Sequence, residues 1–305
     1  MAVPSPAVES YLIAGSRRTE VRGAQTLELY PRQYAVEASP IAHLRFAFRH
    51  EPIDMGLLVA ALKAMEASTL ERWVRAEPTG TFSRRAWFFY ETFTGQMLNL
   101  EDVRVGNYVE ALDSKRFFVT GRRNSPRHRV ADNLLGPPGL CPIVRRTPRL
   151  QQQVGMQVDE EARALVAGFD ALTLARAVNY LYTKETRSSF AIEGETPSAM
   201  RAERFVAALK GAASFDPSDK AASVRLQGDI VDPRYAAGDW RDFQNFIGEV
   251  AGGYREEVHF ICPRPDAVAA LMEGWAALTR RVLDSDLDPV IAAALSAFAF
   301  VFIHP

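Results

Sequence analysis

The sequence predicts a mainly α-helical protein in which a helical core with one β-hairpin follows a small mixed or helical N-terminal domain. Three observations predict this class. Apolar residues recur at helical spacing through much of the second half, proline follows a polar residue at two expected helix starts, and two β-prone runs flank Gly252-Gly253. The composition, with 48% hydrophobic and 24% charged residues among 305, is typical of a globular protein. Disordered, collagen-like and disulfide-scaffold proteins are therefore excluded.

The first part of the chain, residues 1–150, mixes short apolar stretches with turn residues. Its clearest element is an amphipathic segment from Met55 to Trp73, where the apolar residues keep roughly helical spacing. Prolines and glycines between Gly136 and Pro148, followed by a run of three glutamines, are typical of a connector. We therefore expect a domain boundary near residue 150.

The second part, residues 151–305, is predicted to be helical. A long helix is expected to begin at Asp159-Glu160-Glu161, because acidic side chains favour the positive end of a helix. Thr196-Pro197 and Asp288-Pro289 each predict a helix start, since a capping side chain precedes proline in the first turn. The apolar stripe expected for the long helix comprises Leu165, Phe169, Leu172, Val178 and Leu181.

The last apolar run, Val290 to Ile303, is shorter than the roughly 18 to 20 residues that a membrane span needs. It predicts a helix that is buried on all sides. The formal net charge is −1, and the N-terminus shows no secretory signal pattern. Cys141 and Cys262 lie far apart without Cys-x-x-Cys spacing, which predicts reduced thiols rather than a disulfide or a zinc site. Together these features favour a cytoplasmic protein without a membrane partner.

Three short motifs carry the functional prediction. The first is Ser189-Phe190-Ala191-Ile192-Glu193-Gly194, in which Ser189 and Glu193 are four residues apart and so share a face of a helix. Taken alone, this pattern also fits a solvated helix end with a glycine cap. The second is Trp240-Arg241 with the run Gln244 to Gly248, followed by Val258 to Pro265. The third is the apolar helix that runs into His304-Pro305.

In this order and at these separations, the motifs resemble those of the Fic family. The first resembles the inhibitory motif of that family, the second its flap hairpin and proline-rich exit, and the third its core helix running into the signature His-Pro-Phe, an acidic residue, Gly-Asn-Gly and two arginines. Trp240 stands where tyrosine is commoner, and Cys262 stands where proline is usual. Only His304 and Pro305 of the signature are present, so we expect the chain to stop inside it and to be inactive by itself.

The resemblance implies an autoinhibited protein adenylyltransferase. Such an enzyme moves AMP from ATP to a Ser, Thr or Tyr hydroxyl of a target protein, with self-modification as one outcome, and it uses Mg²⁺. His304 would take the hydroxyl proton, because an imidazole titrates near neutral pH. The metal-binding carboxylate, the phosphate-binding amides and the arginines would follow Pro305, so no metal ligand is expected within the chain.

The resemblance also assigns two regulatory or binding elements. An inhibitory helix over about residues 174–194 would present Ser189, Glu193 and Gly194. Glu193 would occupy an arginine that otherwise binds the γ-phosphate, since one guanidinium fork holds either a carboxylate or a phosphate. A flap over about residues 244–262 would pair with an extended target segment. Its residues nearest the nucleotide and the target are Gln244, Ile247, Gly248 and Glu249.

Two other interpretations stay open. The stretch 115–149 contains no acidic residue up to position 129, which favours nucleic-acid binding, although such runs are more often a solvated face. Its basic residues are Lys115, Arg116, Arg122, Arg123, Arg127, Arg129, Arg145, Arg146 and Arg149. The chain could alternatively be a non-catalytic Fic-like module. The nucleotide donor, the target and the oligomeric state are not predicted.

Overall fold

The computed structural model describes residues 6–23, 25–192, 194, 196–231, 234, 236–251 and 255–305. The chain is mainly α-helical and divides into two compact units, residues 1–146 and 147–305. The division falls between Arg146 and Thr147, close to the boundary expected near residue 150. Within the described residues, no helix combines the length and apolar character needed to cross a membrane.

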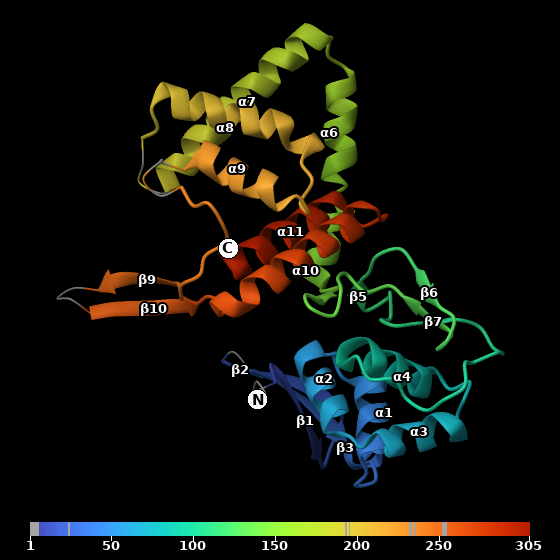
Figure 1. Cartoon of the computed structure of the whole chain (residues 1–305). Coiled ribbons are helices and arrows are strands. Elements are labelled where there is room, and N and C mark those ends of the chain that lie inside the picture. The colour runs from blue at the N-terminus through green and yellow to red at the C-terminus, as the bar shows by residue number, and fades with distance from the viewer. Residues whose placement is uncertain are drawn as a thin grey trace. The chain divides into compact units, whose positions relative to one another are not determined.

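The first unit combines a small sheet with a helical cluster (Figure 1). In the sheet, β3 lies between β1, to which it is parallel, and β2, to which it is antiparallel. A second, short three-stranded sheet in the order β4-β7-β6, the pair β5 and β8, and irregular segments complete the unit. The helices are α1 (Pro40–His50), α2 (Met55–Ala64), α3 (Ala67–Ala76) and α4 (Thr81–Thr94). The strands are β1 (Val8–Ile13), β2 (Arg18–Arg22), β3 (Gln25–Pro31), β4 (Val109–Glu110), β5 (Phe117–Phe118), β6 (Arg123–Ser125), β7 (Val130–Asp132) and β8 (Val144–Arg145).

Helix α4 is the centre of the first unit, although its sequence pattern did not single it out. All residues from Ser83 to Glu91 are buried, and α2 and α3 both pack against this helix. The aromatic run Trp87 to Tyr90 fills the core. Burial of the polar members is tolerated because they are bonded: the Arg85 Nε donates to the carbonyl of Ala111 at 2.9 Å. Desolvation lowers the pKa of Arg85 to about 10.

Several helix boundaries differ from those expected. The amphipathic segment Met55–Trp73 is two helices, because Met65 and Glu66 adopt extended backbone between α2 and α3. The long helix expected from residue 159 breaks near Gly168 into two helices, and the Asp170 carboxylate caps the second by accepting from the Leu172 and Thr173 amides, each at 3.0 Å. The helix expected to start at Thr196-Pro197 begins at Ala199, because the side-chain hydroxyl of Ser198, rather than that of Thr196, caps it.

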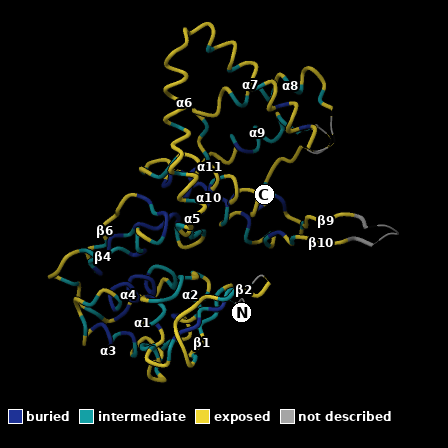
Figure 2. The backbone as a smooth tube through the Cα atoms, turned by 180° about the vertical axis from the view of Figure 1, so that it is seen from behind, coloured by how far each residue is buried: buried dark blue, intermediate teal, exposed yellow. Residues whose placement is uncertain are grey.

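The second unit is an array of helices with one hairpin. Its helices are α5 (Pro148–Gly155), α6 (Val158–Ala167), α7 (Ala171–Ile192), α8 (Ala199–Gly211), α9 (Lys220–Ile230), α10 (Pro265–Leu283) and α11 (Pro289–Ile303). The strands β9 (Phe246–Ala251) and β10 (Arg255–Ile261) pair antiparallel, which confirms the predicted hairpin. The expected turn residues Gly252-Gly253 lie outside the described residues. Figure 2 shows the contrast in burial between α6 and α7, which are largely exposed, and α10.

The expected apolar stripe is mostly exposed: Leu165, Phe169, Leu172 and Leu181 all carry large solvent-accessible fractions. The prediction that the last helix is buried on all sides is likewise wrong. One side of α11 packs on α10, where the Trp275 indole N–H donates to the Ser296 carbonyl at 2.9 Å. Val290, Phe298 and Val301 are exposed on α11. The all-round apolar composition of a helix therefore does not require that all sides be covered within this chain.

Candidate functional site

His304 lies directly after α11 and is the centre of the candidate site. Asp288 caps the start of this helix by accepting hydrogen bonds from the amides of Val290 and Ile291 at 3.0 and 3.1 Å, as its Asp-Pro sequence predicts. At the other end, the His304 amide donates to the Phe300 carbonyl at 3.0 Å. The residue has φ 49° and ψ 63°, the left-handed conformation that glycine usually supplies. Its side chain is exposed.

Arg241 binds the end of α11 to the start of the hairpin. Its guanidinium donates to the carbonyls of His304 at 2.6 Å, Ile303 at 3.1 Å, Pro263 at 2.6 Å and Phe243 at 3.0 Å. The residue is only 8% exposed, and among the described residues it has no acidic partner. A planar guanidinium can bind several carbonyls at once because its N–H groups point in fixed directions. Arg241 therefore fixes the backbone of His304.

The base of the hairpin is held by a second set of hydrogen bonds. The Gln244 side-chain amide donates to the Cys262 carbonyl at 2.8 Å, and the Cys262 amide donates to the Asn245 carbonyl at 3.1 Å. The Phe260 and Phe302 rings lie 5.9 Å apart and pack β10 on α11. Gln244, one of the four predicted flap residues, thus orients the hairpin beside His304.

The other predicted flap residues lie on β9. Ile247 and Glu249 are exposed, and the Glu249 carboxylate lies 3.5 Å from the His259 imidazole. Gly248 faces Val258, and a Cβ added there would lie 2.5 Å from the Glu257 carbonyl oxygen. The strand pairing at this position therefore requires glycine. A register shift between Val258 and Phe260 locally bends β10.

The predicted inhibitory motif lies at the end of α7 and in the residues that follow this helix. Ser189 is exposed near the end of α7 and, among the described residues, forms no hydrogen bond or ion pair. Its neighbour Phe190 is buried against α8, with 5.6 Å between the Phe190 and Phe205 ring centroids. Gly194 has φ 67°, the conformation of a glycine after a helix end. Glu193 lies outside the described residues.

Arg241 is the site residue to which the sequence motifs assigned no role. The Trp240-Arg241 pair is visible in the sequence, and a buried arginine needs hydrogen-bond partners. For two of the hydrogen bonds of Arg241, however, the partners are carbonyls more than 60 residues further along the chain. For a metal ion, no set of three or more His, Cys, Asp or Glu side chains is suitably placed in the described part of the chain.

The basic stretch of the first unit is largely engaged in internal contacts. Five of its arginines donate hydrogen bonds to backbone carbonyls or to carboxylates of the same unit: Arg116, Arg122, Arg127, Arg129 and Arg146. Arg127, for example, bonds both oxygens of the Glu91 carboxylate at 2.9 Å and also the Leu98 carbonyl at 2.8 Å. Guanidinium groups that are already paired have few donors left for phosphate. Nucleic-acid binding by the remaining basic residues of the stretch stays a prediction.

No protein-family model, no curated protein and no solved structure matches this chain.

Proposed function

We propose that residues 147–305 form the base-bearing part of a Fic-type protein adenylyltransferase. The observation that supports this proposal is the Arg241 cluster, which joins two motifs that are more than 60 residues apart. It sets an exposed histidine at a helix end beside a β-hairpin, as the resemblance implies for the base and the flap. Neither motif is specific alone. The support comes from the buried guanidinium of Arg241, which bonds the residues of one motif to those of the other.

The chemistry that this arrangement would perform is the transfer of AMP to a hydroxyl. The hydroxyl oxygen attacks the α-phosphorus of ATP, the bond to the bridging oxygen of the β-phosphate breaks, and pyrophosphate leaves. The hydroxyl proton passes to the imidazole of His304. Mg²⁺, when bound, would neutralise phosphate charge, and the proposal requires that residues following Pro305 supply its acidic ligand, the phosphate-binding amides and the arginines.

The hairpin would position the target. A two-stranded hairpin leaves one free edge on each strand, and an extended target segment can add to such an edge through main-chain hydrogen bonds. Ile247 is exposed there for contact with the modified side chain. The Arg241 and Gln244 contacts at the base would hold this edge at a fixed distance from His304.

The test uses the protein with the sequence that follows Pro305 and ATP labelled on its α-phosphate. We expect label to enter protein, His304→Ala to abolish transfer, and Glu193→Gly to increase self-modification. A matched control is His259→Ala, because His259 is an exposed histidine on the hairpin that is not assigned as the base. Transfer that persists in His304→Ala would refute the assigned base. Lack of transfer with every nucleoside triphosphate would favour the non-catalytic module.

A further inference from the structure

Strand β1 of the first unit has an unpaired edge. Among the described residues it pairs with β3 alone, and no hydrogen bond occupies the N–H and C=O groups on its outer side. Two large apolar side chains on it, Tyr11 and Leu12, are about half exposed. A strand edge of this kind is a template for another extended segment.

The opposite edge of the same sheet is protected. Strand β2 carries Arg18, Glu20 and Arg22, and the Glu20 carboxylate forms ion pairs with Arg18 at 3.0 Å and Arg22 at 2.9 Å. Charged side chains along an edge strand hinder the addition of another strand. Strand β1 carries one charged residue, Glu9, whose carboxylate accepts hydrogen bonds from the Tyr11 hydroxyl and the Gln25 amide. The two edges therefore differ, and β1 is the better suited to pairing.

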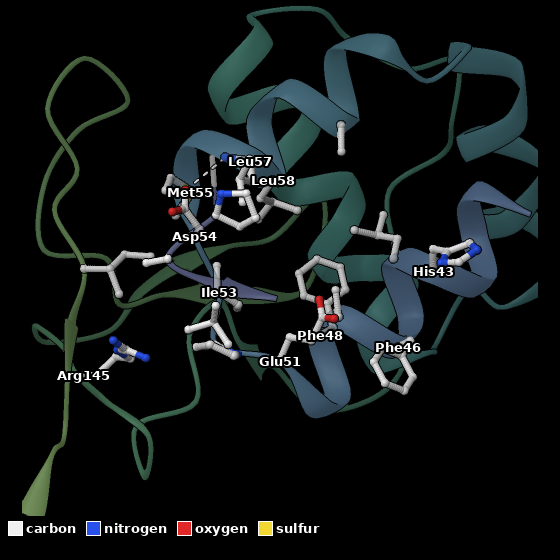
Figure 3. Close-up of a pocket in the computed structure, with 18 of the residues that line it drawn as sticks. His43, Phe46, Phe48, Glu51, Ile53, Asp54, Met55, Leu57, Leu58 and Arg145 are labelled. Atoms are coloured by element: carbon white, nitrogen blue, oxygen red, sulfur yellow. Dashed lines mark hydrogen bonds between the residues drawn. The ribbon is translucent and has the colours of Figure 1, made fainter. Parts of the chain in front are cut away.

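Two cavities lie along β1. The larger one, of about 630 Å³, is lined by Pro6, Ala7 and Val8 together with residues of α1 and α2, and Figure 3 shows its apolar walls. The smaller one, of about 330 Å³, is lined by Ser10, Tyr11 and Leu12. Both share His43, Phe46 and Glu51. They are thus two neighbouring depressions of one groove, which we call the β1 groove.

The spacing of the cavities matches an extended peptide. Ala7 is the middle residue of the segment that lines the larger cavity, and Tyr11 is the middle residue of the segment that lines the smaller one. These two positions are four residues apart, which is about 13 Å at the usual rise of a strand. In a strand added to β1, residues i and i+4 lie on the same face at this distance, with residue i+2 midway between them. Two large apolar side chains at i and i+4 would fill the two cavities.

The charge of Glu51, which lines both cavities, determines which side chain suits position i+2 of the added strand. Within the described chain the Glu51 carboxylate has no hydrogen-bond or ion-pair partner, whereas its carbonyl accepts from Arg116 at 2.6 Å. The Asp54 carboxylate, in contrast, already has a hydrogen-bond partner, because it caps α2 by accepting from the Leu57 amide at 3.0 Å. Arg145 lies at another wall of the larger cavity, away from Glu51 (Figure 3). A basic side chain at i+2 therefore complements Glu51.

We propose that the β1 groove binds an extended segment of a partner protein that carries apolar side chains at i and i+4 and lysine or arginine at i+2. The main chain of the segment pairs with β1, the apolar side chains enter the two cavities, and the basic side chain meets Glu51. This inference is independent of the adenylyltransferase proposal, because it uses only residues of the first unit.

The test uses the full chain and a fluorescein-labelled heptapeptide, Thr-Leu-Thr-Lys-Thr-Leu-Thr, with binding followed by fluorescence anisotropy. We expect saturable binding, which a peptide with N-methyl groups on the amides facing β1 loses. Replacing the peptide lysine by glutamate weakens binding, and Glu51→Lys reverses the preference between the two peptides. Glu51→Gln weakens binding of the lysine peptide by about 1.5- to 5-fold, as expected for a half-exposed ion pair.

Two protein variants separate the cavity from the charge. Ala61→Trp fills the rim of the larger cavity from an exposed helical position, so the fold tolerates it while affinity falls at least about tenfold. Glu20→Gln, on the protected edge, leaves affinity unchanged. Absence of saturable binding at millimolar peptide, or binding that N-methylation does not affect, overturns the proposal. So does a dimer that Leu12→Lys dissociates, because a second copy would then be the occupant.

Discussion

Replacing Arg241 by alanine should release the end of α11 and the base of the hairpin together. The guanidinium holds four carbonyls, and a hydrogen bond from a charged donor contributes about 1.5 to 3 kcal/mol. The carbonyls of the exposed residues Phe243 and His304 regain water when released, but Ile303 is buried and Pro263 is half-buried. Counting these last two alone gives a local cost of about 3 to 6 kcal/mol.

Hydrogen exchange measures this cost where it arises. With about 1.4 kcal/mol per factor of ten, a loss of 3 kcal/mol accelerates exchange by roughly 100-fold at amides that open locally. The reporters are the amides of Cys262 and His304, which donate to Asn245 and Phe300. Arg264→Ala is the matched control, because that side chain is 78% exposed and, within the described part of the chain, pairs only with Asp266. If exchange at both reporters in Arg241→Ala stays within about twofold of the unchanged protein, the guanidinium does not hold this site and the reasoning fails.

Three further predictions concern stability. Glu91→Gln should destabilise the first unit by about 2 to 4 kcal/mol in urea denaturation, because Arg127 loses a buried carboxylate, whereas Glu20→Gln should leave the transition in place. Acid should destabilise the same unit in two steps. Burial lowers the pKa of the His128 imidazole, so stability falls once pH drops below its ordinary value of 6.5. Burial raises the pKa of Glu91, but hydrogen bonds from Arg127, Trp87 and the Leu98 amide outweigh this and hold that pKa below its ordinary 4.5, so a second loss follows under that pH. Melting temperatures from pH 8 to 3 test both steps. A profile that is flat below pH 6.5, or a lower step that is undiminished in Glu91→Gln, would contradict the assignment. Gly248→Ala should weaken the hairpin by about 1 to 3 kcal/mol, because the new methyl group would meet the Glu257 carbonyl oxygen at 2.5 Å. Gly238→Ala, where a Cβ meets no atom within 4 Å, is its control, and equal hairpin exchange rates in the two variants would refute the clash.

The sequence predicted those elements whose signals are local. The hairpin follows from two β-prone runs, and α11 follows from an Asp-Pro start before an apolar run. Helix α4 escaped prediction because Arg85 and Glu91 interrupt its apolar pattern, and the groups that make their burial tolerable lie 26 and 36 residues further along the chain, at Ala111 and Arg127. No local pattern encodes such partners.

The candidate site shows the same division. His304 was predicted from the order of three motifs that resemble those of the Fic family, and its role stays a prediction. Its attachment to the hairpin depends on Arg241, whose bonds to Ile303 and His304 span 62 and 63 residues. The apolar stripe of α6 and α7 failed for a related reason. Periodicity indicates which face of a helix is apolar, but it does not indicate whether another element of this chain covers that face.

The left-handed backbone of His304 gives a last prediction, in which stability and the proposed activity should change in opposite directions. A residue other than glycine at φ 49° costs about 1 to 2 kcal/mol, and glycine at this position removes that cost. We therefore expect His304→Gly to slow exchange at the end of α11 while it abolishes AMP transfer. His304→Ala keeps the strain and also abolishes transfer, so the pair separates the backbone effect from the loss of the imidazole. If both variants destabilise the helix end equally, the backbone there is not strained. In that case the His304 side chain, rather than the hydrogen bonds from Arg241, would stabilise the backbone conformation at residue 304.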